Sequence, residues 1–357
     1  MTRDNRLKLA VLIGIIGVGI ACEILLATLA HAQRRSEKKN ETVSTIAFVS
    51  TRDRPSSDPQ LSLAVDTEIY LMNGDGTNVR RLTDNSYGEC FPSISPNGKT
   101  IVFDSNRLRS ANEPMNTSDL FLMNTDGTDQ RHLTRGSSAT WSRDSKLIAY
   151  HASASGAGKP IALFPGAATS DSDIFVIRVG KKDAQPKNIT NNPTAIDDDA
   201  DWSPTEDRIV FVSKPLHDNP TNAVSAELYV MNADGSGKPQ RLTNNNEEER
   251  APAWSHDGKR ILFLCRRGGS DFEICIMNSD GSGQTQLTNN TVADLTASWS
   301  PDGSKIVVHR PVSRGRFQLW LLNVDGSGET QLTDTPGLNG FPNWGTIRPV
   351  ITTSNQR

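Results

Sequence analysis

The chain has 357 residues, enough for two ordinary domains or for one long all-β domain. Its formal net charge at pH 7 is -3, from 38 Lys and Arg against 41 Asp and Glu. Such a charge balance provides no basic surface field to attract nucleic acid, so we expect no nucleic-acid partner.

The N-terminus has the pattern of a targeting or anchoring segment. Basic residues precede an apolar run from Leu9 to Cys22, and Ala30-His31-Ala32 resembles the small-x-small site that signal peptidases cut. If Glu23 is tolerated, the segment from Leu9 to Ala30 is also long enough for a transmembrane helix. Residues 1–32 are therefore expected to be a cleaved signal peptide or a retained membrane anchor, and residues 33–45 a linker. Either alternative predicts a location in the cell envelope, periplasmic or extracytoplasmic.

One pattern then occurs six times, and its first half contains a tryptophan in five of the copies. In the first copy Ile94 takes the place of the tryptophan. The five tryptophans that share the position are Trp141, Trp202, Trp254, Trp299 and Trp344. Five of the chain's six tryptophans thus occupy one repeat position, which indicates a true internal repeat.

The second half of each copy contains an apolar strand such as 101–103, a second strand such as 68–73, a tight turn and a short Leu-Thr strand. The turns are Asp75-Gly76, Asp126-Gly127, Asp234-Gly235, Asp280-Gly281 and Asp325-Gly326. Asp-Gly between apolar runs is a strong hairpin signal, because glycine adopts the positive φ of the turn without steric cost. The third copy, residues 173–190, lacks this turn. Each repeat is therefore predicted to form four antiparallel strands.

The spacing and the ends of the repeats predict the fold. Successive Asp-Gly turns are 45 to 51 residues apart where no copy is skipped, and four-stranded repeats of about 40 to 50 residues are typical of a β-propeller. The repeats begin with a second strand, Ile46 to Ser50, and stop after a first strand, Asn343-Trp344. Pairing these two strands completes a sixth blade and leaves no open edge. We expect an all-β, six-bladed, monomeric propeller over residues 46–345 and a C-terminal tail over 346–357.

The repeats, of which Trp299-Ser-Pro-Asp-Gly303 is the clearest opening, resemble the TolB-type, WD-like β-propeller family over residues 46 to 344. The resemblance implies the same six-bladed fold. Propellers of this kind serve as periplasmic partners of lipoproteins, as gates of peptidases and occasionally as lyases, so the resemblance implies a fold more strongly than a function.

One face of the predicted propeller carries the longer loops. Loops between the second and third strands are long in four successive blades: 51–67, 106–118, 151–172 and 214–226. The connections between blades share this face and lead to the innermost strand. About five residues before each tryptophan position stand Glu89, Ser137, Asp197, Glu249, Asp294 and Asn339, which we name the predicted acidic ring. We expect this ring at the mouth of the central channel.

Three interpretations of the predicted acidic ring remain open. Its oxygen atoms suit a hard cation, and a Ca²⁺ site in the channel is predicted at Asp197, Asp198, Glu249 and Asp294. It also suits a basic peptide or protein partner. The third alternative is a solvated channel mouth whose carboxylates only cap turns.

The sequence favours binding over catalysis. It contains no Gly-x-Ser-x-Gly motif, and its six histidines share no local motif. We therefore expect a non-catalytic propeller that binds a protein, a peptide or another envelope ligand, an envelope lipoprotein among them, at its loop-rich acidic face. The alternative is a cation-dependent polysaccharide lyase-like or hydrolase-associated enzyme that uses the channel, for which His151 and His217 are the only basic candidates on that face.

Cys265 and Cys275 stand in the second and third strands of one predicted hairpin, at nearly equal distances from its turn. Such a register places them opposite or nearly opposite each other, close enough for a disulfide. Cys275 also replaces the aromatic residue of the other copies. Because export implies an oxidising compartment, we predict a disulfide between them, and two small buried neighbours are the alternative.

Overall fold

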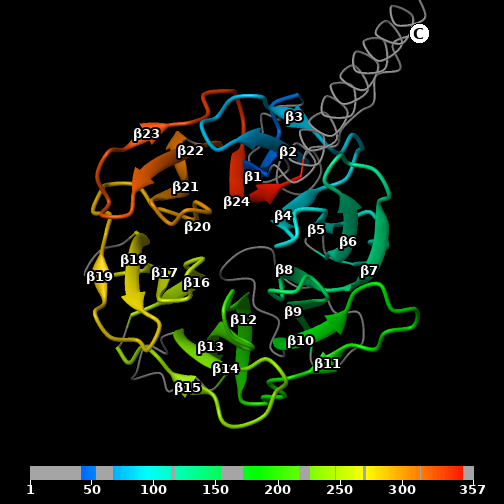
Figure 1. Cartoon of the computed structure of the whole chain (residues 1–357), viewed down its shortest axis with the longest axis vertical. Helices are drawn as coiled ribbons and strands as arrows, with labels where there is room; N and C mark the ends of the chain where they lie inside the picture. The colour runs from blue at the N-terminus through cyan, green and yellow to red at the C-terminus, as the bar shows by residue number, and fades with distance from the viewer. Residues whose placement is uncertain are drawn as a thin grey trace, which may run out of the picture. The chain divides into compact units, whose positions relative to one another are not determined.

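The computed structural model describes residues 42–53, 67–113, 117–153, 172–216, 226–245, 247–267, 271–313 and 315–348. Ser44–Ile347 form one compact unit, in which six four-stranded antiparallel sheets stand around a central axis (Figure 1). The prediction of an all-β, six-bladed propeller is confirmed. The predicted signal or anchor, with the linker as far as residue 41, lies outside the described residues. Within the described ranges, the structure contains no helix whose length and apolarity would let it span a membrane.

The blades are numbered from the one that contains the N-terminal strand, and their strands are given from the innermost outward. Blade 1 contains β24 (Asn339–Ile347), β1 (Val43–Ser50), β2 (Glu68–Asn73) and β3 (Arg80–Arg81). Blade 2 contains β4 (Glu89–Ile94), β5 (Thr100–Ser105), β6 (Asp119–Asn124) and β7 (Arg131–Arg135). Blade 3 contains β8 (Ser137–Trp141), β9 (Leu147–Ser153), β10 (Ser172–Arg178) and β11 (Lys187–Asn188).

The remaining blades follow the same order. Blade 4 contains β12 (Ala195–Trp202), β13 (Arg208–Pro215), β14 (Glu227–Asn232) and β15 (Gln240–Arg241). Blade 5 contains β16 (Glu249–Trp254), β17 (Arg260–Cys265), β18 (Glu273–Asn278) and β19 (Thr285–Gln286). Blade 6 contains β20 (Thr296–Trp299), β21 (Lys305–Ser313), β22 (Arg316–Asn323) and β23 (Thr330–Gln331).

Blade 1 is assembled from both ends of the propeller, because β24 lies beside β1 in one sheet. At one end of the pair the Trp344 indole N–H donates to the Ser44 hydroxyl at 2.8 Å. At the other end the Thr51 amide donates to the Leu338 carbonyl at 3.0 Å. The last strand therefore closes the ring and covers the edge that β1 would otherwise expose.

The repeated tryptophans hold neighbouring blades together. Trp141 packs with Ile148 of its own blade against Val102 and Leu120 of blade 2. Trp254 makes the equivalent contact between blades 5 and 4, and Trp344 the one between blades 1 and 6. Each indole is almost fully buried. The tryptophan position is thus a packing feature of the fold, which explains its recurrence without any catalytic role.

The conserved turn motifs of the repeats also have structural roles. In the turn after β16, the Ser255 hydroxyl donates to the Asp257 carboxylate at 2.6 Å, and that carboxylate accepts the Lys259 amide. At the outer turns the Asp-Gly glycines have positive φ, such as 89° at Gly127, as predicted. A Cβ atom on Gly127 would lie 2.8 Å from the Leu82 carbonyl oxygen of blade 1, so the turn also needs glycine for close packing.

Four of the innermost strands each contain a β-bulge that the repeat pattern in the sequence does not predict. The pairing of β4, β8, β12 and β16 with the next strand shifts register inside each strand, two or three residues before its last residue. The residues at this bulge with positive φ are Phe91, Ser138, Asp199 and Ala251, and Phe341 of β24 has the same conformation. The bulge turns the side chain three residues before the tryptophan position toward the channel.

Cys265 and Cys275 are joined by a disulfide in the structure, with their Cα atoms 5.9 Å apart. They are not directly opposite: Cys265 pairs with Glu273 and Cys275 pairs with Phe263. The two cysteines are therefore diagonal neighbours on one face of the β17–β18 hairpin, because the hairpin is centred one residue before the midpoint of the two cysteines. Both side chains are fully buried.

Candidate functional site

A cavity of about 790 Å³ occupies the centre of the propeller. All six innermost strands contribute to its wall, from the turns at one face to the connections between blades at the other. The side chain three residues before each tryptophan position lines the cavity in all six blades, and five of these six residues have positive φ. We name these six side chains the channel ring: Phe341, Phe91, Ser138, Asp199, Ala251 and Thr296, in the order of blades 1 to 6.

One wall of the cavity is apolar and aromatic. Phe91 and Phe341 belong to neighbouring blades, and their ring centroids lie 4.6 Å apart. His309 of β21 packs edge-on against Phe341 at 5.1 Å. Bulky residues rarely adopt positive φ, and the two phenylalanines hold it while facing the channel, which marks this wall as a candidate functional feature.

His309 is a buried imidazole on the aromatic wall. It is 2% exposed, and neither ring nitrogen has a hydrogen-bond partner in the described part of the chain. Burial lowers its pKa to about 3, so the ring is neutral at physiological pH. Gly340 provides the space for it, because a Cβ atom at residue 340 would lie 2.5 Å from the imidazole. A neutral imidazole of this kind is available to one polar atom of a bound ligand.

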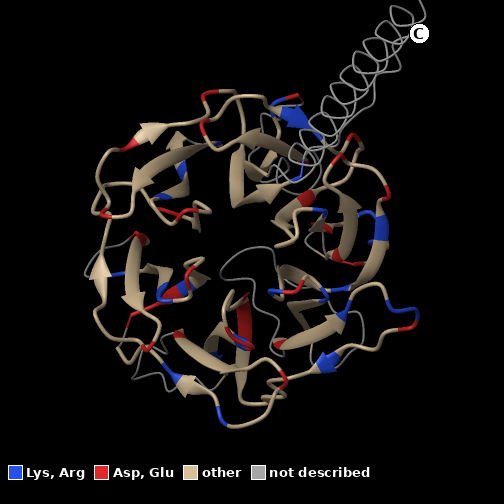
Figure 2. Ribbon diagram, in the orientation of Figure 1, with Lys and Arg blue, Asp and Glu red and all other residues tan. Residues whose placement is uncertain are grey.

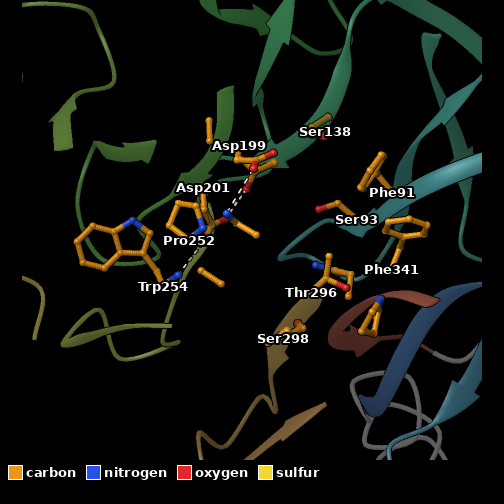
Figure 3. A pocket seen from close by; sticks show the side chains of 18 of the residues that line it. Phe91, Ser93, Ser138, Asp199, Asp201, Pro252, Trp254, Thr296, Ser298 and Phe341 are labelled. Carbon is orange, nitrogen blue, oxygen red and sulfur yellow. Dashed lines mark hydrogen bonds between the residues drawn. The ribbon is translucent and has the colours of Figure 1, made fainter. Parts of the chain in front are cut away.

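The wall provided by blades 3, 4 and 5 is polar. Asp198 and Asp199 lie on β12, and Figure 2 shows the acidic segment of β12 beside the channel. Arg250 of β16 contacts Asp198 at 3.3 Å and Glu248 at 2.7 Å. The Asp199 carboxylate accepts the Ala251 amide at 3.3 Å. Blade 4 stands opposite blade 1 in a ring of six, and Figure 3 shows Asp199 on the side of the channel away from Phe91 and Phe341.

The electrostatics of this wall follow from burial. Burial is the main cause that raises the pKa of Asp198 to about 8; the Asp199 charge raises it further, and the Arg250 charge opposes the rise. Burial lowers the pKa of His151, and the Asp199 charge opposes that shift. Burial thus disfavours the ionised form of Asp198 and the charged form of His151 on this wall.

Asp201, two residues beyond Asp199, links three blades. Its carboxylate accepts the Trp254 amide of blade 5 at 2.7 Å and the Thr140 hydroxyl of blade 3 at 2.8 Å. Burial raises its pKa to about 6. Asp201 therefore fixes the spacing of the strands that carry the polar wall.

The predicted acidic ring does not line the channel. All six side chains are buried, and none of them belongs to the cavity wall. Their partners lie within their own blades, in a neighbouring connection or, for Ser137, in the neighbouring blade. Glu89 accepts Arg107 at 2.7 Å, Asp294 accepts Arg310 at 2.7 Å, and Asn339 accepts the Ser50 hydroxyl at 2.8 Å. The expected position at the channel mouth is wrong, because these residues precede the bulge and point into the blade.

The other three members of the predicted acidic ring also form hydrogen bonds with side chains inside the protein. Asp197 accepts the Ser213 hydroxyl at 2.6 Å, and Glu249 accepts the Asn245 amide at 2.8 Å. Ser137 donates to Asp104 of blade 2. Ser137 also stands one position out of register, since Gly136 precedes it at the place that Glu249 takes in blade 5.

The side chains proposed for Ca²⁺ do not come together. Within the described ranges, no group of three or more His, Cys, Asp or Glu side chains has the geometry to hold a metal ion. Asp294 is paired with Arg310 and Asp198 with Arg250, which already balance their charge. The prediction of a Ca²⁺ site at Asp197, Asp198, Glu249 and Asp294 is therefore not supported by the positions of these residues.

Only some of the histidines and long loops named for the enzyme alternative belong to the residues that the structure describes. His151 lies in β9 and lines the cavity, whereas His217 lies outside the described residues. Most of the three long loops 51–67, 151–172 and 214–226 also lies outside them, as does the short stretch 114–116. The sequence reasoning missed the channel ring itself. Counting three residues back from each tryptophan, instead of about five, would have found it.

Comparison with known proteins identifies the family. A family model described as the TolB beta propeller domain, PD40, matches residues 155–348. A 70-residue segment is 39% identical to the Tol-Pal system protein TolB of Desulfosudis oleivorans, covering 19% of this chain and 14% of that protein. A 50-residue segment is 50% identical to dipeptidyl-peptidase 5 of Porphyromonas gingivalis, covering 14% of this chain and 7% of the relative. The chain thus spans about a seventh or less of these curated relatives.

Solved structures share the fold. TolB from Acinetobacter baumannii superposes with a TM-score of 0.64 at 19% identity, over 85% of this chain and 66% of that one. A putative TolB from Agrobacterium tumefaciens gives a TM-score of 0.56 at 18% identity, over 87% of this chain and all of the other. At these identities the likeness concerns the fold. The family match covers more than half of the sequence, and the chain belongs to the TolB β-propeller (PD40) family.

Proposed function

We propose that this protein is a non-catalytic binding module of the cell envelope, and that its central channel receives an extended peptide segment of a protein partner. The observation that carries the proposal is the two-sided cavity. An apolar wall at Phe91 and Phe341 and a charged wall at Asp198 and Asp199 suit a chain that presents apolar and polar side chains in alternation.

The cavity contains polar atoms that a ligand would satisfy. His309 lacks a partner for both ring nitrogens, and His151 lacks one for Nδ1, within the described residues. Buried polar groups without hydrogen bonds are costly, so atoms of this kind favour water or ligand binding over dry packing. The six innermost strands already form the wall of the cavity. The protein therefore loses little conformational entropy when a ligand binds.

The partner and the location rest on other observations. The relative in Desulfosudis oleivorans is named as a protein of the Tol-Pal system, which favours a protein partner for this chain. The basic and apolar pattern of residues 1–32 favours export or anchoring in the envelope. The disulfide between Cys265 and Cys275 is in accord with an oxidising compartment.

The proposal is tested with a random peptide library displayed on phage and panned against the purified full-length chain. The blocking variant is Ala251→Phe, which fills the channel with the residue that blades 1 and 2 already tolerate at the same positive φ. The matched control is Val79→Phe, because Val79 is 40% exposed on an outer turn. Selected peptides are expected to bind the wild type and Val79→Phe equally and to lose at least about tenfold in affinity for Ala251→Phe.

Two results would overturn the proposal. One is equal affinity of the selected peptides for all three proteins, which would place binding elsewhere on the surface. The other is failure to select any peptide above the background of an uncoated surface. Thermal melting of both variants within a few degrees of the wild type would exclude unfolding as the cause of lost binding.

A further inference from the structure

The polar wall of the channel contains side-chain atoms that lack hydrogen-bond partners. In the part of the chain that the structure describes, Asp198 Oδ1 and His151 Nδ1 are buried and have no partner. His151 is 5% exposed and lines the cavity. Asp199 stands beside them at the tip of the β12 bulge, and its one hydrogen bond to the Ala251 amide is long, at 3.3 Å. We name Asp198, Asp199 and His151 the acceptor pocket.

The nearest arginine is already engaged. Arg250 is 7% exposed, and its Nε and Nη2 atoms contact one oxygen of Glu248 at 3.0 and 2.7 Å. Its Nη1 atom contacts the other oxygen of Asp198, Oδ2, at 3.3 Å. A guanidinium held on both sides in this way cannot also turn to Asp199. The acceptor pocket therefore keeps a deficit of donors even with Arg250 in place.

The charged groups that act on the pocket come from three strands, and a fourth strand contributes a neutral imidazole. Asp197 and Asp199 of β12 raise the pKa of Asp198 by repulsion, and Arg250 of β16 and Lys214 of β13 lower it. On β9, His151 is a neutral ring, since burial lowers its pKa. A neutral imidazole has one nitrogen that accepts. A carboxyl group accepts at both oxygens when it is ionised, and keeps only one donor-free oxygen when it is protonated. The pocket thus suits a ligand group that carries positive charge and several N–H donors.

The aromatic wall opposite the acceptor pocket determines which chemical groups can lie beside a bound cation. Phe91 and Phe341 of blades 2 and 1 face the pocket across the channel, and no described charged side chain belongs to the channel ring besides Asp199. Figure 3 shows the two phenylalanines on the side away from Asp199. An aromatic wall stabilises the aliphatic stem of a cationic side chain, or an apolar neighbour of it, and attracts the charge itself.

We propose that the acceptor pocket binds a primary ammonium or guanidinium group, from a lysine, an arginine or an amino terminus, next to an apolar residue on Phe91 and Phe341. The inference rests on the proposed function, because it names the chemistry of the peptide that the channel receives. It assigns selectivity to Asp199 and contact roles to Asp198 and His151.

Binding of the cation is linked to a proton. Since the pKa of Asp198 is raised to about 8, its carboxyl is largely protonated at pH 6 in the free channel. An incoming cation stabilises the ionised form and releases that proton, so affinity rises between pH 6 and pH 8. An arginine peptide with blocked ends and no other ionisable group keeps its own charge over this range.

The experiment uses the arginine- or lysine-containing peptides that bind in the panning described above. Each is compared with a neutral copy, in which citrulline replaces arginine or norleucine replaces lysine, against the full-length wild type, Asp199→Asn and Asp207→Asn. Asn tolerates the positive φ of residue 199 and still accepts the Ala251 amide. Asp207 is a matched control because its side chain is 71% exposed.

The neutral copies are expected to bind the wild type and Asp207→Asn at least about tenfold more weakly than the charged peptides. With Asp199→Asn, charged and neutral copies should bind with nearly the same affinity. The wild-type affinity for the arginine peptide should also rise from pH 6 to pH 8, whereas that for its citrulline copy should not.

Distinct results separate this inference from the proposed function. If Ala251→Phe blocks binding while charged and neutral copies bind the wild type equally, the channel receives peptides and the cation pocket is wrong. Selection of only peptides that lack a basic residue would also show that the cation pocket is wrong. If Ala251→Phe leaves binding intact, the channel is not the site, and both proposals fail.

Discussion

The Asp104 carboxyl is surrounded by groups from outside its own strand, so its environment cannot be inferred from the sequence of that strand. It lies on β5 and is 1% exposed, and it accepts the Ser137 and Ser118 hydroxyls and the Ser138 amide. Burial raises its pKa to about 8, and hydrogen bonds from the two hydroxyls and the amide oppose the rise. Sequence alone predicts the strand over residues 101–103 but not this environment, because the partners come from a loop and from the next blade.

The raised pKa of Asp104 predicts a pH dependence of stability. A carboxyl that keeps its proton to about pH 8 when folded, and loses it near pH 4 when unfolded, stabilises the folded state below pH 4. This contribution decreases as pH rises toward 8. The melting temperature should therefore fall from pH 5 to pH 8, and Asp104→Asn should reduce the slope.

Differential scanning fluorimetry at several pH values measures that slope. The control is Asp302→Asn, because the pKa of Asp302 is lowered to about 2 by the Ser300 hydroxyl, below the tested range. Its replacement is expected to lower stability by a similar amount at every pH. A slope that Asp104→Asn leaves unchanged would mean that Asp104 is ionised in the folded protein at neutral pH.

At the scale of elements, the sequence predicts that β12 is an innermost strand but does not predict which of its side chains face the channel. Trp202 and the repeat pattern around it correctly predict an innermost strand. The bulge between Asp198 and Asp201 then shifts which carboxylate faces the channel. No residue type marks the bulge, since the positions with positive φ are Phe91, Ser138, Asp199, Ala251 and Phe341. The strand was therefore predictable, and the orientation of its side chains was not.

The β17–β18 hairpin gives a prediction about its cysteines. Cys265 and Cys275 are bridged across diagonal positions, and Cys90 is a buried free thiol. Thiol labelling of the denatured, unreduced full-length chain should find two reactive cysteines of the four in the sequence. Reduction should destabilise the protein by on the order of 2 to 3 kcal/mol, because the loop closed by the bridge is short.

Mass spectrometry of the labelled chain checks which thiols react. Cys265→Ser provides the control, since it should add Cys275 to the labelled set and should melt like the reduced wild type. Labelling of Cys265 and Cys275 in the wild type isolated from the envelope would contradict both the bridge and the oxidising location.

At the scale of the molecule, the number of blades and the closure follow from two sequence facts. The repeats begin with a second strand at Ile46 and end with a first strand at Trp344, and only a ring that pairs them leaves no unpaired edge. The structure has β24 beside β1. The bonds of Trp344 to Ser44 and of Thr51 to Leu338 lie at the two ends of this pair.

Removal of β24 should therefore destabilise the whole propeller. A chain that ends at Thr333 loses the Trp344 packing between blades 6 and 1 and exposes the edge of β1. We expect a melting temperature lower by at least about 10 °C, or aggregation, as for the loss of several kcal/mol in a large domain. A chain that ends at Arg348 keeps β24 and is the control. Equal cooperative melting of the two shortened chains would show that closure by β24 is not needed.

Closure by the last strand also has a consequence for biosynthesis. β24 brings Phe341 to the channel ring, so one sixth of the binding wall is absent until residue 347 has been made. Every earlier product of the ribosome is an open arc with a free edge. The order of strands thus delays the binding-competent state until translation of the propeller is complete. The complete channel therefore exists only once the last strand has joined the first blade.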